Sequence, residues 1–71
     1  MSRPALKLRL QVHALAARRG YSAAELARRA GIPAQTVRKI FKDPERMPQT
    51  VTLYKLARAL ECRSIADLFE E

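Results

Sequence analysis

The sequence predicts a compact all-α domain of five short helices. Ala, Leu, Arg, Lys and Glu, which favour helices, dominate the chain, and no segment shows the strict alternation of apolar and polar residues that a half-buried strand requires. Glycines and prolines divide it into segments of helical length with short connections. With 71 residues, of which 48% are hydrophobic, the chain is expected to form one domain, residues 1–71, around a small core.

The first two predicted helices are separated by Gly20, which suits the left-handed position after a helix end. The first helix spans residues 5–19. Ser22 begins the second helix: its hydroxyl can accept a hydrogen bond from the first turn while the Glu25 side chain reaches back to the Ser22 amide, an arrangement called a capping box. Gly31 ends this helix. The apolar stripe of the first helix comprises Leu8, Leu10, Val12, Ala14, Leu15 and Ala17.

The third predicted helix starts at Pro33, because the first helical position does not need the amide hydrogen that proline lacks. It ends at residue 41 or 42, and two prolines make residues 43–48 a loop. The fourth helix runs from residue 49 or 50 to residue 60, and a short fifth helix follows with Ser64 as its cap. The residues expected to be buried on the last two helices are Leu53, Leu56, Ala57, Leu60, Ile65, Leu68 and Phe69.

Positive charge is concentrated in the first part of the chain. The net charge is +7 and the pI is about 10.6. Residues 1–42 carry ten Lys or Arg and a single acid, whereas residues 43–71 carry four Lys or Arg and six acids. A basic balance of this kind is typical of domains that bind nucleic acid, and its alternative explanation is a solvated face that keeps the protein soluble.

The second and third helices have the pattern of a helix-turn-helix, in which two helices cross steeply over a short turn. Such a crossing needs a small residue, here Ala27, and a turn glycine that tolerates positive φ, here Gly31. It also needs apolar anchors on the facing sides of both helices. These are Leu26, Ala30, Ile32, Val37 and Ile40.

Residues 22–32, SAAELARRAGI, resemble the helix-turn-helix of the lambda-repressor-like family, also called the XRE or Cro type. The similarity continues through residues 53–60, LYKLARAL, and residues 65–69, IADLF, and covers residues 6–69 in all. It implies a five-helix lambda-repressor-like DNA-binding domain. Proteins of this family usually act as dimers on two-fold operators, with recognition helices about 34 Å apart.

The resemblance also implies roles for individual side chains. The exposed face near the start of the third helix reads base edges: Gln pairs with adenine, Arg and Lys with guanine, and Ala can contact a thymine methyl group. The residues of this sequence on that face are Ala34, Gln35, Arg38 and Lys39. Phosphates are held by the amides that begin the second helix and by cations that follow the third. The corresponding residues are Ser22, Ala23, Lys42 and Arg46.

Three positions depart from the family pattern. Ala23 stands where the family often has a Gln that helps to hold DNA, which leaves the backbone amide alone there. Ala16 and Phe41 stand where many members form an Arg–Glu ion pair, so Phe41 is expected to be buried against the first helix. Asp43 and Glu45 bring acids close to the expected phosphate path.

The sequence offers no chemistry for catalysis. His13 is the only histidine and is expected at the surface, without a metal site or other cofactor. Cys62, the only cysteine, cannot form an internal disulfide and is expected to behave as a small hydrophobe, with a redox switch as its alternative. With no apolar run long enough for a membrane span and no signal peptide, we expect a soluble, non-enzymatic protein of the cytoplasm, associated with the nucleoid.

These features together predict a transcriptional regulator, of repressor type, that binds double-stranded DNA as a homodimer. Two alternatives stay open. One is an antitoxin that binds DNA and also a toxin. The other is a protein-interaction module that has lost DNA binding, for which Ala23 and Ala34 are the supporting residues.

Overall fold

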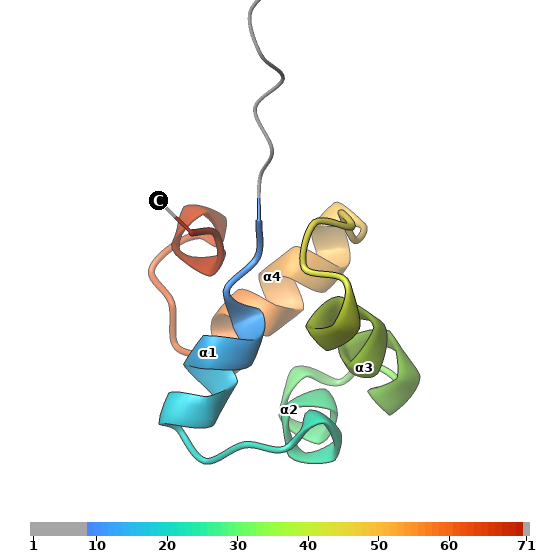
Figure 1. Cartoon of the computed structure of the whole chain (residues 1–71). Helices are drawn as coiled ribbons and strands as arrows, with labels where there is room; N and C mark the ends of the chain where they lie inside the picture. The colour runs from blue at the N-terminus through green and yellow to red at the C-terminus, as the bar shows by residue number, and fades with distance from the viewer. Residues whose placement is uncertain (1–8, 71) are drawn as a thin grey trace, which may run out of the picture.

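The computed structural model describes residues 9–70, and these residues form four α-helices and one 3₁₀ helix (Figure 1). The helices are α1 (Val12–Arg18), α2 (Ala23–Ala30), α3 (Ala34–Lys42), α4 (Thr50–Ala59) and the 3₁₀ helix η1 (Ile65–Leu68). In Figure 1, α3 lies on one flank of the molecule and η1 on the opposite flank. Within residues 9–70, no helix is long and apolar enough to cross a membrane.

The core forms where the apolar stripes of all four helices meet. Leu26, Val37 and Leu56, one from each of α2, α3 and α4, have no solvent exposure. The four residues predicted to be buried on the fourth helix are all buried: Leu53, Leu56, Ala57 and Leu60. The complete set of buried residues is Leu10, Val12, Ala16, Leu26, Ala27, Val37, Ile40, Leu53, Leu56, Ala57, Leu60 and Leu68.

Of the helix predicted over residues 5–19, residues 5–8 lie outside the described part of the chain, and over the rest α1 is shorter than predicted. It begins at Val12, because the backbone before it makes hydrogen bonds to distant segments: the Leu10 amide donates to the Pro44 carbonyl at 2.8 Å and the Gln11 amide to the Leu68 carbonyl at 2.7 Å. Leu10 is therefore buried from an extended segment. Two members of the predicted stripe, Ala14 and Ala17, are exposed, and Leu8 lies outside the described residues.

The predicted cap of α2 is confirmed in one half and wrong in the other. The Ser22 hydroxyl accepts a hydrogen bond from the Glu25 amide at 3.1 Å, and Gly31 ends the helix with φ 72°. The Glu25 carboxylate does not return to the Ser22 amide, because Arg28 and Arg29 bind it instead, each with a shortest N–O distance of 2.6 Å. Two guanidinium groups are stronger partners for a carboxylate than one exposed amide.

The last three predicted elements lie where expected, with two corrections. Pro33 precedes α3 as its cap residue, with ψ 141°, so the helix begins one residue later than predicted. The predicted fifth α-helix is the 3₁₀ helix η1, and the Ser64 hydroxyl makes no capping hydrogen bond to it. The Arg63 amide donates instead to the Asp67 carboxylate at 3.1 Å, and Phe69 returns to extended backbone to pair with Leu10, which leaves no room for a longer helix.

Candidate nucleic-acid interface

One face of α3 is packed on the core and the opposite face is solvated. Val37 and Ile40 are buried. Gln35 and the polar residues three, four and seven positions after it are exposed. We call these four residues the α3 polar face: Gln35, Arg38, Lys39 and Lys42. Ala34 is half-buried and packs against the core, so it presents less surface than the other predicted base-reading residues.

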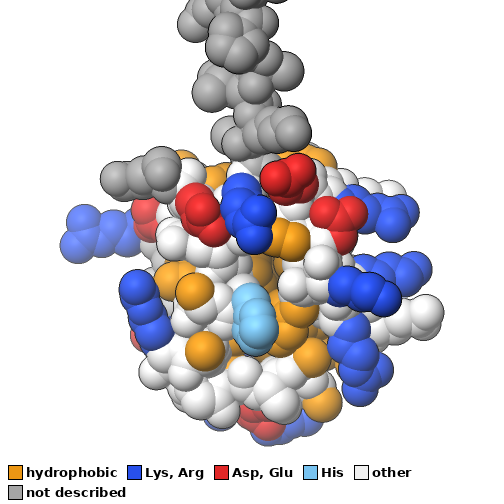
Figure 2. Space-filling model, in the orientation of Figure 1, with side chains coloured by type: hydrophobic (Ala, Val, Ile, Leu, Met, Phe, Trp, Pro, Cys, Tyr) orange, Lys and Arg blue, Asp and Glu red, His pale blue; other side chains and the backbone are white. Residues whose placement is uncertain are grey.

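No acid in the described part of the chain neutralises the cations of the α3 polar face. Within residues 9–70, no Asp or Glu oxygen lies within 4.0 Å of Arg38, Lys39, Lys42 or Arg46, whereas Arg9, Arg19, Arg28 and Arg29 all form ion pairs. In Figure 2, Lys and Arg side chains line the side of the molecule on which Figure 1 draws α3. A helix that presents unpaired cations to water attracts a polyanion.

The start of α2 supplies a second group of donors. The first amides of a helix have no acceptor within the helix, and those of Ala23 and Ala24 are in this position beside the exposed Ser22. Glu25 would repel an anion here, but hydrogen bonds from Arg28 and Arg29 neutralise it. The same hydrogen bonds hold the pKa of Glu25 below its usual value and raise the pKa of Arg28. The structure thus keeps this helix end suitable for a phosphate.

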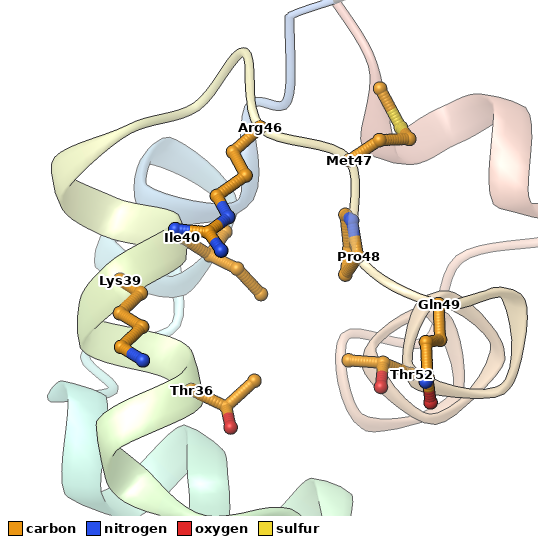
Figure 3. A pocket seen from close by; sticks show the side chains of 8 residues that line it. All are labelled: Thr36, Lys39, Ile40, Arg46, Met47, Pro48, Gln49 and Thr52. Carbon is orange, nitrogen blue, oxygen red and sulfur yellow. The ribbon is translucent and has the colours of Figure 1, made fainter.

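A recess of about 320 Å³ opens between α3 and α4, beneath the loop that joins them (Figure 3). Lys39 was predicted to contact a base and Arg46 a phosphate, and both side chains line this recess. The uncharged polar residues that line it were not predicted as site residues. The recess is lined by Thr36, Lys39, Ile40, Arg46, Met47, Pro48, Gln49 and Thr52. Helical spacing groups Thr36 with Lys39 and Gln49 with Thr52, but only the path of the loop between α3 and α4 brings the two pairs to one recess.

The acids of the loop differ in their surroundings. Glu45 lies 3.7 Å from the Arg9 guanidinium, which also binds Glu70 at 3.2 Å. This cation reduces the repulsion that Glu45 would exert on a nearby phosphate. Asp43 is exposed and forms no ion pair within the described chain.

The other residues singled out in the sequence serve packing. Phe41 is half-buried against the core and stacks on the exposed ring of His13, so the expected contact with α1 is confirmed, although the ring keeps some exposure. Cys62 is half-buried, and burial raises the pKa of its thiol above the usual value. Residues 9–70 contain no group of three His, Cys, Asp or Glu side chains that could hold a metal ion.

Comparison with known proteins identifies one family for this chain. Searches of curated proteins and of solved structures returned no significant match. The model of one protein family, described as the Cro/C1-type HTH DNA-binding domain, matches residues 11–70. The match covers all four α-helices, the helix-turn-helix formed by α2 and α3, and η1. The chain therefore belongs to the Cro/C1-type helix-turn-helix DNA-binding family.

Proposed function

We propose that residues 1–71 form one domain that acts as a transcriptional regulator of repressor type and inserts α3 into the major groove of double-stranded DNA. The observation that carries the proposal is the α3 polar face, which is exposed along its length and whose cations have no acidic partner within residues 9–70. Because membership of the family implies DNA binding, this face is the natural contact surface. We further propose that the protein has no enzymatic activity and no cofactor and that it binds the nucleoid in the cytoplasm.

Base reading falls to the exposed residues nearest the start of α3. Gln35 can pair with the N6 and N7 edge of adenine, and Arg38 can donate two hydrogen bonds to O6 and N7 of guanine. Ala34, which is half-buried, can offer only its methyl group to a thymine. Phosphate contacts at the two ends of the helix-turn-helix fall to the amides at Ser22 and Ala23 and to the side chains of Lys42 and Arg46. These contacts fix the register of the protein on the duplex, and the base contacts give it sequence preference.

We propose further that two copies bind a two-fold operator. Leu68 and Phe69 offer little surface for pairing two copies, because Leu68 has no exposure and Phe69 is half-buried and bridged to Leu10. The expected complex is a pair assembled on DNA, with half-sites about one helical turn apart.

One observation favours a protein partner as the second candidate function. Met47, Val51 and Tyr54 are exposed by 46%, 55% and 59%, and they lie in or beside the first part of α4. Exposed side chains of this size are common at protein interfaces. A toxin or another protein that covers them would make the chain an antitoxin or an interaction module.

The experiment that tests the proposal is selection of bound sequences from a pool of random duplexes at two salt concentrations. We expect enrichment of a two-fold motif and a steep fall of affinity with salt, since each neutralised phosphate contributes about −0.9 to the log–log slope. Binding without enrichment would assign the basic face to non-specific DNA packaging. No binding at low salt would contradict the proposal and favour the protein partner.

A further inference from the structure

We infer that the outward side of α4, together with a recess beside the end of α2, is a docking surface for an acidic, partly apolar segment of a partner protein. We call it the α4 surface, and its residues are all exposed: Val51, Tyr54, Lys55, Arg58 and, across the recess, Arg28. The inference goes beyond DNA binding, which the proposed function assigns to other residues. It gives the second candidate function a site and a partner of stated chemistry.

The exposed residues of α4 in this surface form one stripe along the helix. Tyr54, Lys55 and Arg58 follow Val51 by three, four and seven positions, which is the spacing of a single helix face. Leu56, which has no exposure, marks the opposite side of the helix, the side packed on the core. At about 1.5 Å per residue the stripe is about 10 Å long. A surface of this length suits a short segment of a partner, bound as a helix or an extended peptide.

The first half of the stripe is apolar. Val51 and Tyr54 are exposed by 55% and 59%. Covering these side chains removes apolar area from water, which is favourable in proportion to the area covered. A sugar-phosphate backbone offers charge but little apolar surface, whereas a protein segment carries apolar side chains beside its carboxylates. This half of the stripe therefore points to a protein as the partner.

The second half of the stripe is cationic and adjoins a recess of about 360 Å³ between α2 and α4. Arg28 and Arg29 line this recess from α2, Lys55 and Arg58 line it from α4, and no acid lines it. Within residues 9–70, Lys55 and Arg58 form no ion pair, whereas Arg28 and Arg29 share the one carboxylate of Glu25. The Arg28 side chain keeps 72% of its surface exposed while it does so. One carboxylate cannot balance four cations, so the recess attracts a partner that brings acids.

The charges argue against a second copy of this chain as the occupant. In a two-fold pairing, the α4 surface of one copy would meet the same surface of the other. Lys55 and Arg58 of both copies would then share one interface, and α4 itself contains no Asp or Glu to balance them. Like charges across an interface repel, whereas carboxylates of a different protein neutralise these cations. The partner is therefore a protein of opposite charge.

A partner on the α4 surface leaves the α3 polar face accessible. Thr52 lies on the side of α4 that lines the recess next to α3. Two successive steps along an α-helix turn the side chain by about 200°, so Tyr54 lies on nearly the opposite side of α4. No residue of α3 lines the recess between α2 and α4. The chain can therefore hold the partner and a duplex at the same time.

The test uses a library of random peptides displayed on phage, from which those that bind the 71-residue chain are selected. We expect the selected peptides to share a cluster of Asp or Glu next to an aromatic or aliphatic residue. The affinity of the best peptide is then measured for two double variants that remove the same charge. The variant Lys55→Gln, Arg58→Gln is expected to lose about tenfold, and the control Arg38→Gln, Lys42→Gln to lose nothing. Equal losses would assign binding to the net charge of the chain and overturn the inference.

Tyr54→Ala tests the apolar half of the surface and is expected to weaken the same peptide, because an exposed ring loses its partner. Selected peptides that lack carboxylates would overturn the inference, as would the enrichment of no peptide. Vesicles of phosphatidylglycerol that bind the chain and release the peptide would overturn it in favour of a membrane. Melting curves of each variant would verify that these exposed substitutions leave the fold intact.

A last measurement separates this inference from the proposed function. With saturating operator present, the peptide is expected to lose no more than about threefold in affinity, because exposed charges farther apart than about 8 Å are largely screened. The DNA motif selected by Lys55→Gln, Arg58→Gln is expected to match that of the wild-type protein. Displacement of the peptide by the operator would overturn the inference. Failure of the wild-type protein to bind any duplex would contradict the proposed function and leave the peptide result standing.

Discussion

The imidazole ring of His13 stacks on the phenyl ring of Phe41, with ring centroids 4.4 Å apart and an angle of 20° between the ring planes. This contact joins α1 to the last turn of α3, next to the fully buried Ala16. The family resemblance places an Arg–Glu ion pair at the positions of Ala16 and Phe41. In this chain the stack of His13 on Phe41 joins α3 to α1 instead.

Replacing Phe41 with Ala is expected to lower the free energy of unfolding by about 1–3 kcal/mol, less than for a fully buried ring because Phe41 is only half-buried. Urea denaturation followed by circular dichroism would measure the change. His13→Ala removes only the exposed partner of the stack, so its expected cost is about 0.5–1.5 kcal/mol. Equal stability of Phe41→Ala and the wild-type protein would show that the stack does not hold α3.

The parts of the fold that the sequence predicts well are those decided by local pattern. The buried stripe of α4, the cap at Ser22 and the left-handed Gly31 all follow from spacing within one turn or two of helix. Two errors are local, because Arg28 and Arg29 take the Glu25 carboxylate and Pro33 caps α3 without belonging to it. The larger errors lie where distant segments meet. The start of α1 and the end of the chain are set by hydrogen bonds from Leu10 and Gln11 to partners 34 and 57 residues away, which no local pattern encodes.

The candidate interface divides in the same way. Exposure of Gln35, Arg38 and Lys39 follows from the helical period once Val37 and Ile40 are assigned to the core. The recess does not follow from any such period, because it depends on how the loop between α3 and α4 places the residues on its two sides. For the same reason the pairing of Arg9 with Glu45, 36 positions apart, could not be predicted.

The cap of α2 provides a local test of stability. Ser22→Ala is expected to lower the free energy of unfolding by about 1 kcal/mol, because the Glu25 amide loses its acceptor. Ser22→Asp is the matched control, since a carboxylate can accept the same hydrogen bond and is favourable at a helix start. Thermal melts of both variants would measure the effect. A larger loss for Asp than for Ala would contradict the role assigned to this cap.

The ion pairs of Glu25 predict a dependence of stability on pH. Hydrogen bonds from Arg28 and Arg29 lower the pKa of Glu25 in the folded protein, so folding favours the ionised form. The resulting stabilisation is present above the ordinary carboxyl pKa of about 4.5 and is lost as the pH falls through the lowered value of the folded state. Denaturation of the wild-type protein and Glu25→Gln between pH 7 and pH 3 would measure it. The difference between the two is expected to shrink toward acid, and a difference that stays constant would contradict this prediction.

Cys62 is expected to react slowly with thiol reagents at neutral pH. Its side chain is half-buried, and burial raises the pKa of the thiol, which lowers the fraction of reactive thiolate. Colorimetric titration of the thiol in buffer and in denaturant would compare the folded and unfolded rates. A folded rate as fast as that of the unfolded chain would instead support the redox switch.

Arg38 provides the most direct test of base reading. Its side chain is exposed and forms no ion pair within residues 9–70, so Arg38→Ala is expected to leave the free energy of unfolding within about 0.5 kcal/mol of the wild-type value. If Arg38 donates two hydrogen bonds to a guanine, the variant loses about 1–3 kcal/mol of affinity for the selected operator and tolerates other bases at that position. Arg38→Lys retains the charge but not the planar pair of donors, so it is expected to recover the salt dependence and only part of the base preference. Titration of operators that carry each of the four bases at this position would measure both effects. Loss of affinity that is equal for all four bases would assign Arg38 to the backbone and leave base reading to Gln35 and Ala34.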